Sequence, residues 1–159
     1  LRHGKSSHGG AAARDFDRPL APRGMRDVPR IAVELEARDM LPELIMSSGA
    51  LRTRQTAELF KQAVKPDILI IFDDTLYLAS AYEIFQAVRA TPDDIRNVMF
   101  VGHNPGMQQL AQQLGGADLN AGKFPTAATV ALALEAETWK ALNPTKTTLS
   151  LFLTPKSLK

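Results

Sequence analysis

The sequence contains no cysteine, few aromatic residues and no long apolar run. The absence of cysteine excludes disulfide bonds, a thiolate nucleophile and a cysteine-ligated zinc site. No apolar stretch approaches the length of a membrane-spanning helix, so we expect no membrane segment. A net charge of +2 without runs of lysine or arginine gives no basis for nucleic-acid binding. These absences fit a cytoplasmic location, which we take as the expectation.

The length and composition indicate one domain that covers residues 1–159. A chain of 159 residues with 45% hydrophobic and 23% charged residues can bury a continuous core. The sequence begins at Leu1, directly before the first candidate site residue. Because a strand needs about five residues, we expect most of the first strand to lie before Leu1. The sequence does not say whether a signal peptide also precedes it.

Hydrophobic periodicity in the first half of the chain predicts two helices and two strands. Residues 5–20 are rich in Ser, Gly, Ala, Asp and Pro and indicate an irregular loop. Apolar residues at helical spacing predict a helix over residues 22–40, in which Pro29 causes a kink or a late start. A short strand over 44–47 precedes a second helix, for which Ser48 can act as the N-cap. The continuous apolar run 68–72 predicts a strand that is covered on both faces.

The second half continues the alternation of strands and helices. We expect a helix over 80–89, a buried strand over 98–101, and a helix that Gly115 and Gly116 end. Asn104 and Pro105 fit the N-cap and the first helical position of that helix. Strands over 129–134 and 149–153 complete the pattern. Strands that alternate with helices predict an α/β fold, a three-layer α/β/α sandwich with a mainly parallel central sheet.

Basic residues follow three of the apolar runs. Arg2 and His3 stand at the start of the chain, Arg52 follows the run over 44–47, and His103 follows the run over 98–101. In an open α/β sheet, ligands bind outside the carboxyl ends of the strands. Two histidines and two arginines that meet there predict a phosphoryl-transfer site without a metal ion.

The residue types suit this chemistry. A histidine nucleophile must be neutral, and Arg2 and Arg52 would disfavour a cationic His3 by like-charge repulsion. Gly4 would let the backbone approach a bound oxyanion, and His103 would stabilise charge on the phosphoryl oxygens. Each residue also has a plainer interpretation: a chance tripeptide in a loop, a surface arginine, or a buried structural histidine.

A metal site is not expected. His8 is the third histidine, but no pair of histidines has a ligand spacing such as H-x-x-x-H. The two arginines beside the site would also repel a cation. We therefore expect neither a metal nor another cofactor.

Three motifs resemble those of the histidine phosphatase superfamily, which has the phosphoglycerate mutase-like fold. They are Arg2-His3-Gly4, the segment Ser48–Ala57, and Gly102-His103. Further segments resemble the SixA branch of phosphohistidine phosphatases, and the resemblance runs nearly end to end: Phe16–Leu20, Leu76-Tyr77, Gly102–Gly106 and Pro155-Lys156.

The resemblance implies a role for each central residue. His3 would become transiently phosphorylated while Arg2, Arg52 and His103 hold the phosphoryl oxygens, and water would then hydrolyse the intermediate. Arg18 is a further candidate phosphate contact, although a salt bridge within the loop explains it equally well. Gly4 and Asn104 complete the candidate substrate-binding residues.

The proton donor for the leaving group is where the sequence departs from the mutase-like members, which carry a glutamate between the second arginine and the second histidine. Here Glu83 is the candidate acid, yet it falls in an expected helix where an exposed charge is the plainer interpretation. The region is also short, which leaves little sequence for a lid. Because an imidazole leaving group needs less help than an alkoxide, both features favour phosphohistidine on a protein as substrate. The alternatives are a phosphatase for a small phosphomonoester, such as a sugar phosphate, and a non-catalytic phosphate-binding module.

Overall fold

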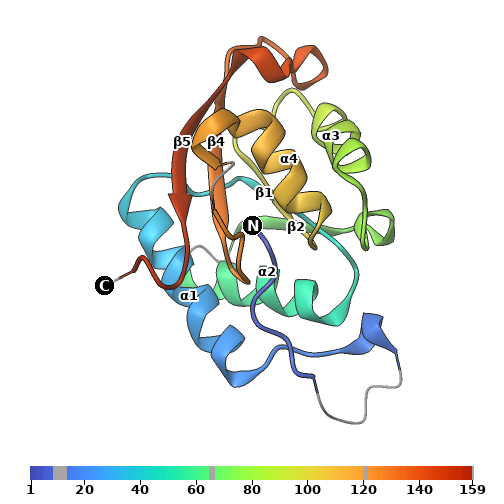
Figure 1. Ribbon diagram of the computed structural model, residues 1–159, viewed down its shortest axis with the longest axis vertical. Helices are drawn as coiled ribbons and strands as arrows, with labels where there is room; N and C mark the ends of the chain where they lie inside the picture. The colour runs from blue at the N-terminus through green and yellow to red at the C-terminus, as the bar shows by residue number, and fades with distance from the viewer. Residues whose placement is uncertain (9–13, 65–66, 120–121, 159) are drawn as a thin grey trace.

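A parallel sheet of three strands forms the centre of the molecule (Figure 1). The computed structural model describes residues 1–8, 14–64, 67–119 and 122–158. The strands β1 (Leu44–Ser47), β2 (Leu69–Phe72) and β3 (Val98–Val101) pair in the order β2–β1–β3. Ser47 lies level with both Phe72 and Val101, so the three carboxyl ends meet at one edge of the sheet.

The first residues of the chain connect this sheet to an antiparallel strand pair. Arg2 forms a parallel bridge with Gly102, directly after β3, and its N–H donates to the carbonyl of Ala128 over 2.9 Å. Ala128 precedes β4 (Thr129–Leu134), which pairs with β5 (Thr147–Leu153). Residues 1–3 therefore lie between β3 and β4, with the candidate residues Arg2 and His3 at that position.

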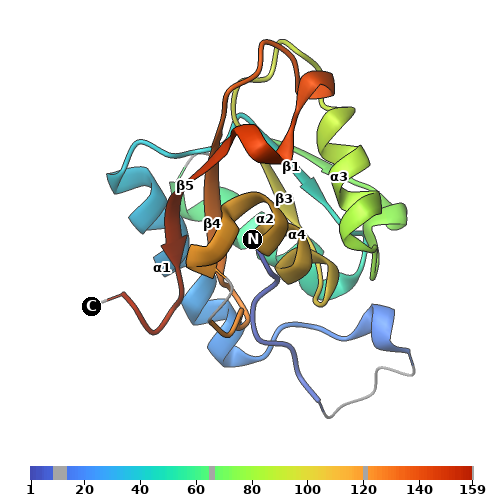
Figure 2. The ribbon, with the colours of Figure 1, turned by 45° about the horizontal axis from the view of Figure 1, so that its top comes forward.

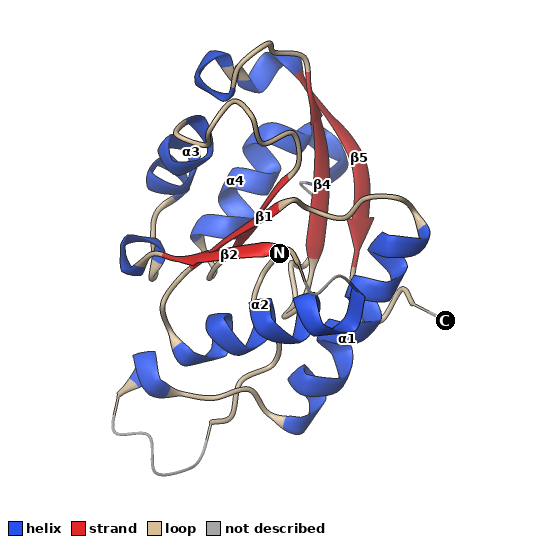
Figure 3. Ribbon diagram, turned by 180° about the vertical axis from the view of Figure 1, so that it is seen from behind, coloured by secondary structure: helices blue, strands red, loops and turns tan. Residues whose placement is uncertain are grey.

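Helices cover both faces of the sheet, as the sequence predicts. In Figure 3, β1 and β2 run between α3 and α4 on one side and α1 and α2 on the other. The helices are α1 (Pro22–Ala37), α2 (Leu51–Val64), α3 (Ala81–Arg89) and α4 (Gly106–Gly115). The α/β fold is confirmed, with three parallel strands at its centre and an antiparallel pair beside them.

Alternate residues of β1 supply the two cores. Ile45 is buried with Val28 of α1 and Phe60 of α2, whereas its neighbour Met46 packs on the opposite side with Ile84 of α3. Successive strand side chains point to opposite faces, so one short strand joins both helical layers. A third cluster, which includes Ala111, Phe124 and Phe152, packs α4 against β4 and β5 (Figures 1 and 2).

The prediction that the strand over 68–72 is covered on both faces is wrong. Leu69 and Ile71 are 56% and 41% exposed, whereas Ile70 and Phe72 pack against the core shared with α1 and α2. Within the described ranges, β2 pairs with β1 alone and is an edge strand. The layer of α3 and α4 does not cover the outer face of this edge, so the apolar run reflects burial on one side only.

Pro29 neither delays nor ends the first helix. α1 runs without interruption from Pro22 to Ala37 with Pro29 inside it. A proline removes the hydrogen bond to the carbonyl four residues earlier, which here belongs to Met25. Met25 is 46% exposed, so this position lies on the solvent side of the helix, which continues past Pro29.

Two expected N-caps are placed differently. α2 begins at Leu51, three residues after Ser48, and α4 begins at Gly106 with Pro105 at the N-cap position. Ser80 does cap α3. The segment predicted as an irregular loop contains the short helix η1 (Asp15–Asp17), while its residues 9–13 lie outside the described part of the chain. Other short 3-10 helices are η2 (Asp74–Leu76), η3 (Gly116–Leu119), η4 (Trp139–Ala141) and η5 (Pro144–Lys146).

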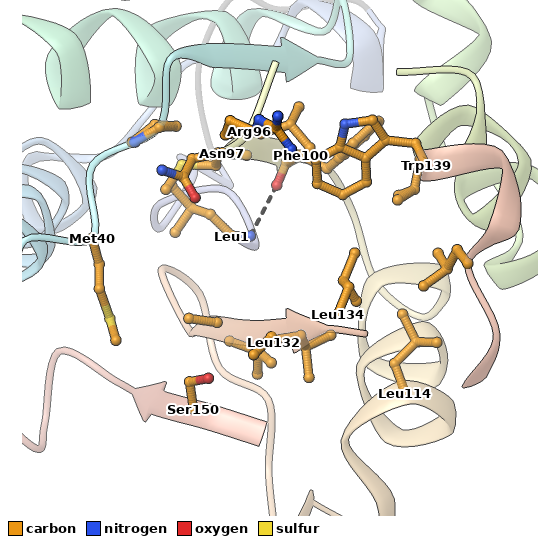
Figure 4. Close-up of a pocket in the computed structure, with 18 of the residues that line it drawn as sticks. Leu1, Met40, Arg96, Asn97, Phe100, Leu114, Leu132, Leu134, Trp139 and Ser150 are labelled. Atoms are coloured by element: carbon orange, nitrogen blue, oxygen red, sulfur yellow. Dashed lines mark hydrogen bonds between the residues drawn. The ribbon is translucent and has the colours of Figure 1, made fainter. Parts of the chain in front are cut away.

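A cavity of about 550 Å³ lies between β3 and β4 (Figure 4). Leu1 lies at its border, where the amino group donates to the carbonyl of Phe100 over 2.9 Å, and Leu132 and Trp139 form part of its apolar lining. None of the four candidate basic residues lines this cavity. Among the described residues, no helix is both long and apolar enough to span a membrane.

Candidate active site

The basic residues predicted from three distant segments lie together at the carboxyl edge of the sheet. The rings of His3 and His103 have their centroids 5.3 Å apart. Arg52, the second residue of α2, places its Nη2 atom 3.2 Å from Nδ1 of His103. His3, Arg52 and His103 are only 7%, 4% and 3% exposed. Burial of so much basic character in one place indicates a site built for an anion.

His3 is held in the form that a nucleophile needs. Its Nδ1 atom lies 2.6 Å from the carbonyl of Gly4, so Nδ1 carries the hydrogen and donates it. In the neutral ring, the lone pair is then on Nε2. Burial, against the opposing hydrogen bond to Gly4 and together with the charges of Arg52, Arg2 and Arg18, lowers the pKa of His3 to about 4. His3 is therefore neutral at physiological pH.

His103 is also neutral, but its hydrogen bonds differ. A guanidinium only donates, so Nδ1 accepts from Arg52 and Nε2 donates to the Ser48 hydroxyl over 2.8 Å. Burial, followed by the charge of Arg52, lowers the pKa of His103 to about 3. A phosphoryl group bound beside Nδ1 would oppose this shift through its negative charge.

Arg2 and Asn104 share one carbonyl group. Nη1 of Arg2 donates to the carbonyl of Phe124 over 2.6 Å, and Nδ2 of Asn104 donates to the same oxygen over 3.3 Å. Asn104 also bonds to Gln108, which is why it does not cap α4 as predicted. Nε of Arg2 and Oδ1 of Asn104 are buried and have no partner among the described residues. Both atoms are available to a ligand or to water.

Gly4 and Arg18 have other contacts than those expected for them. The N–H of Gly4 donates to Oγ1 of Thr56, so it is not free to bind an oxyanion. A Cβ atom at Gly4 would lie 2.9 Å from the side chain of Val28, and this close packing explains the glycine. Arg18 donates to the carbonyl of Ser7 and forms an ion pair with Asp15, the loop salt bridge that was its alternative interpretation.

Two residues that the sequence reasoning missed stand at the edge of the site. The carboxylate of Asp15 lies 2.9 Å from Nη2 of Arg52 and accepts a hydrogen bond from the hydroxyl of Tyr77. The edge of the Tyr77 ring contacts His103, with centroids 5.3 Å apart. These hydrogen bonds and the charge of Arg52 lower the pKa of Asp15, against a smaller opposing effect of burial. Tyr77 stood in a segment that the resemblance included, but no sequence pattern linked Asp15 to Arg52.

Glu83, the candidate acid, has a structural role instead. It is exposed, and its carboxylate accepts hydrogen bonds from the N–H and the hydroxyl of Ser80 in the capping box of α3. The capping box accounts for Glu83, and we assign it no catalytic role. Within the described ranges, no group of three or more His, Asp or Glu side chains could hold a metal ion.

Two neutral histidines and two arginines at the carboxyl edge of an α/β sheet match the arrangement that the sequence predicts for a phosphoryl-transfer site. Comparison with known proteins agrees, since the family model of the histidine phosphatase superfamily (branch 1) matches residues 1–77. A SixA protein from Agrobacterium tumefaciens is 32% identical; the match covers 98% of this chain and 95% of that protein, with a TM-score of 0.84. The chain therefore belongs to the histidine phosphatase superfamily, in its SixA-like branch, and is a phosphatase.

Two further relatives extend the comparison. An uncharacterised chloroplastic protein of Arabidopsis thaliana is 34% identical over 129 residues, which cover 75% of this chain and 59% of that protein. The protein histidine phosphatase SixA, solved with tungstate, is 22% identical and has a TM-score of 0.83 over 100% of this chain and 97% of its own. At that identity the similarity concerns the fold.

Proposed function

We propose that this protein removes the phosphoryl group from phosphohistidine on proteins, through a covalent intermediate on His3. The observation that carries the proposal is the state of His3, which is buried, neutral and bonded through Nδ1 to Gly4. This arrangement leaves the Nε2 lone pair for attack on phosphorus.

The surrounding residues would stabilise the reaction. The transition state of phosphoryl transfer is loose and spreads negative charge over three oxygens, so fixed positive groups stabilise it. Arg2 and Arg52 would supply these groups, and His103 would bind a phosphoryl oxygen beside them. Attack by Nε2 of His3 forms a new P–N bond while the bond to the leaving group breaks. Water then attacks the phosphorus of phosphorylated His3, which releases phosphate and restores the neutral ring.

The leaving group indicates the substrate class. An alkoxide needs a proton as it departs, but Glu83 is bound in its capping box and Asp15 is held as a carboxylate. An imidazole that already carries a proton on its other nitrogen departs without this help. The SixA relative from Agrobacterium tumefaciens, which carries the provisional name phosphohistidine phosphatase, supports the same choice.

A comparison of substrates with trapping of the intermediate tests the proposal. Wild-type protein should dephosphorylate a histidine-phosphorylated phosphotransfer domain faster than sugar phosphates, and an acid-labile phosphate should be trapped on His3. His3→Ala should abolish both signals, whereas His8→Ala should retain them because His8 is exposed and bonds only to Lys5 in the described structure. Preference for sugar phosphates would instead support a small phosphomonoester as substrate. Phosphate binding without turnover would indicate a non-catalytic module.

A further inference from the structure

The exposed edge of the site is formed by Asp15, of η1, and Tyr77. We propose that the carboxylate of Asp15 contacts the leaving imidazole, accepts a hydrogen bond from its N–H, and so selects phosphoramidates over phosphomonoesters. This inference rests on the proposed function and assigns the residue that recognises its substrate class.

Burial gives the direction in which the leaving group departs. His3, Arg52 and His103 are 3–7% exposed and form the floor of the site, whereas the side chain of Asp15 is 45% exposed. In phosphoryl transfer, the attacking and leaving atoms lie roughly in line on opposite sides of phosphorus. A nucleophile on the buried floor therefore directs the leaving group toward solvent, where Asp15 and Tyr77 stand.

The hydrogen bonds of Asp15 leave room for one more donor. A carboxylate has about four lone-pair positions. Tyr77 and Arg52 donate to Oδ2, and Arg18 donates to Oδ1 over 2.9 Å. Counting only the described part of the chain, these three contacts hold the carboxylate in place and leave one position, on Oδ1, for a donor from the substrate.

An imidazole leaving group can use that position. In phosphohistidine with a proton on the second nitrogen, the ring is cationic and its N–H faces away from the phosphoryl group. When the P–N bond breaks, the electron pair stays on the departing nitrogen and the proton stays on the other, so a neutral imidazole leaves. Asp15 stabilises the cationic ring before cleavage without transferring a proton.

A phosphomonoester gains nothing from the same carboxylate. Its leaving oxygen becomes negative as the P–O bond breaks, and Asp15 has no proton to donate because Tyr77 and Arg52 hold it ionised. An anionic neighbour repels that developing charge. Asp15 should therefore favour one class of leaving group and disfavour the other.

Two substrates and two aspartate variants test this inference. Phosphoimidazole supplies the cationic leaving group without a protein partner, and p-nitrophenyl phosphate supplies an ester whose leaving group needs no acid. Asp15→Asn should lower kcat/KM for phosphoimidazole about 10- to 100-fold, as expected for a lost hydrogen bond to a charged group, and should leave the ester rate unchanged or higher, because the carboxylate repels the charge that develops on the leaving oxygen. Asp17→Asn is the matched control, because Asp17 lies in the same short helix and pairs with Arg14.

The outcomes separate this inference from the proposed function. An equal loss on both substrates in Asp15→Asn, or no loss on either, would overturn the leaving-group contact; the first result would mean that Asp15 only positions Arg52. If wild-type protein cleaves the ester through His3 but no phosphoramidate, the proposed function fails and the inference fails with it. Selective loss on phosphoimidazole, with Asp17→Asn unchanged, supports the inference.

Discussion

At the scale of single residues, the site depends on keeping two adjacent histidines uncharged. Burial and the charge of Arg52 lower the pKa of both His3 and His103, to about 4 and about 3. Cationic histidines could bind a phosphoryl group through their charge. A cationic His3, however, would have no lone pair on Nε2 for attack on phosphorus. As a consequence, the two histidines bind protons less readily in the folded protein than in the unfolded chain.

This difference predicts acid sensitivity of the fold. An unfolded histidine binds a proton near its ordinary pKa of 6.5, whereas folded His103 does so only near 3. Between these values the unfolded state binds more protons, so the free energy of unfolding falls as pH falls, by at most about 1.4 kcal/mol per pH unit for each histidine. Urea unfolding at pH 7 and pH 5 measures the slope. His103→Asn should weaken the pH dependence, and an unchanged slope would contradict the neutral assignment.

The residues found from sequence share one property. Arg2, His3, Arg52 and His103 each follow a strand or stand in a motif, so the chain order indicates that they meet. Asp15 lacks this property, and the Leu76-Tyr77 segment gave Tyr77 no role, because the contact between the two residues depends on how η1 lies against the segment before α3. Long-range placement of two irregular segments leaves no periodic signal in the sequence.

At the scale of elements, close contact between α1 and the segment after His3 supports the nucleophile. A Cβ atom at Gly24 would lie only 2.3 Å from the carbonyl oxygen of Lys5. That carbonyl also accepts a hydrogen bond from the N–H of Ala21, directly before the helix. Glycine at this helical position therefore lets α1 approach the backbone two residues beyond His3.

Gly24→Ala tests the importance of this contact. In an exposed helix the change would stabilise the protein by up to about 1 kcal/mol, but here we expect a loss of about 1–3 kcal/mol from overpacking. Turnover should fall as well, because displacement of Lys5 displaces His3. Gly122→Ala, where nothing lies within 4 Å of the added atom, should change neither quantity. Thermal unfolding and steady-state assays make the comparison, and a stabilised, fully active Gly24→Ala would contradict it.

Hydrophobic periodicity predicted the positions of the helices and strands well. It predicted less well which of their faces are buried. The bounds of β1 and β3 follow directly from short apolar runs between polar residues. Coverage of β2 did not follow, because an apolar run of five residues gives the same pattern whether one face or both are buried. The start of α4 also differs by one residue, since Asn104 bonds to Gln108 and Phe124 rather than to the helix N-terminus.

At the scale of the whole molecule, the site joins segments that are far apart in the chain. Arg2 and His3 come from the first residues, Arg52 from the first turn of α2, and His103 from the connection between β3 and α4. The same first residues lie between the parallel sheet and the β4–β5 pair. An anion held by all four side chains would therefore connect these parts of the fold. Its binding should raise the free energy of unfolding of the whole molecule.

Vanadate, a phosphate analogue, provides the measurement. A ligand that binds only the folded state stabilises it by about 2.7 kcal/mol at 100 times its dissociation constant, and the thermal midpoint should rise accordingly. Arg52→Ala removes a buried guanidinium from the site and should abolish most of this rise. Arg54→Ala is the matched control: Arg54 lies on the same helix, but its guanidinium stacks over Phe72 at 4.2 Å, so the vanadate shift should persist. Because each variant is compared with itself with and without vanadate, any change in its basal stability cancels. An equal shift in Arg52→Ala and wild type would show that the anion binds elsewhere and that the buried arginine serves the fold alone.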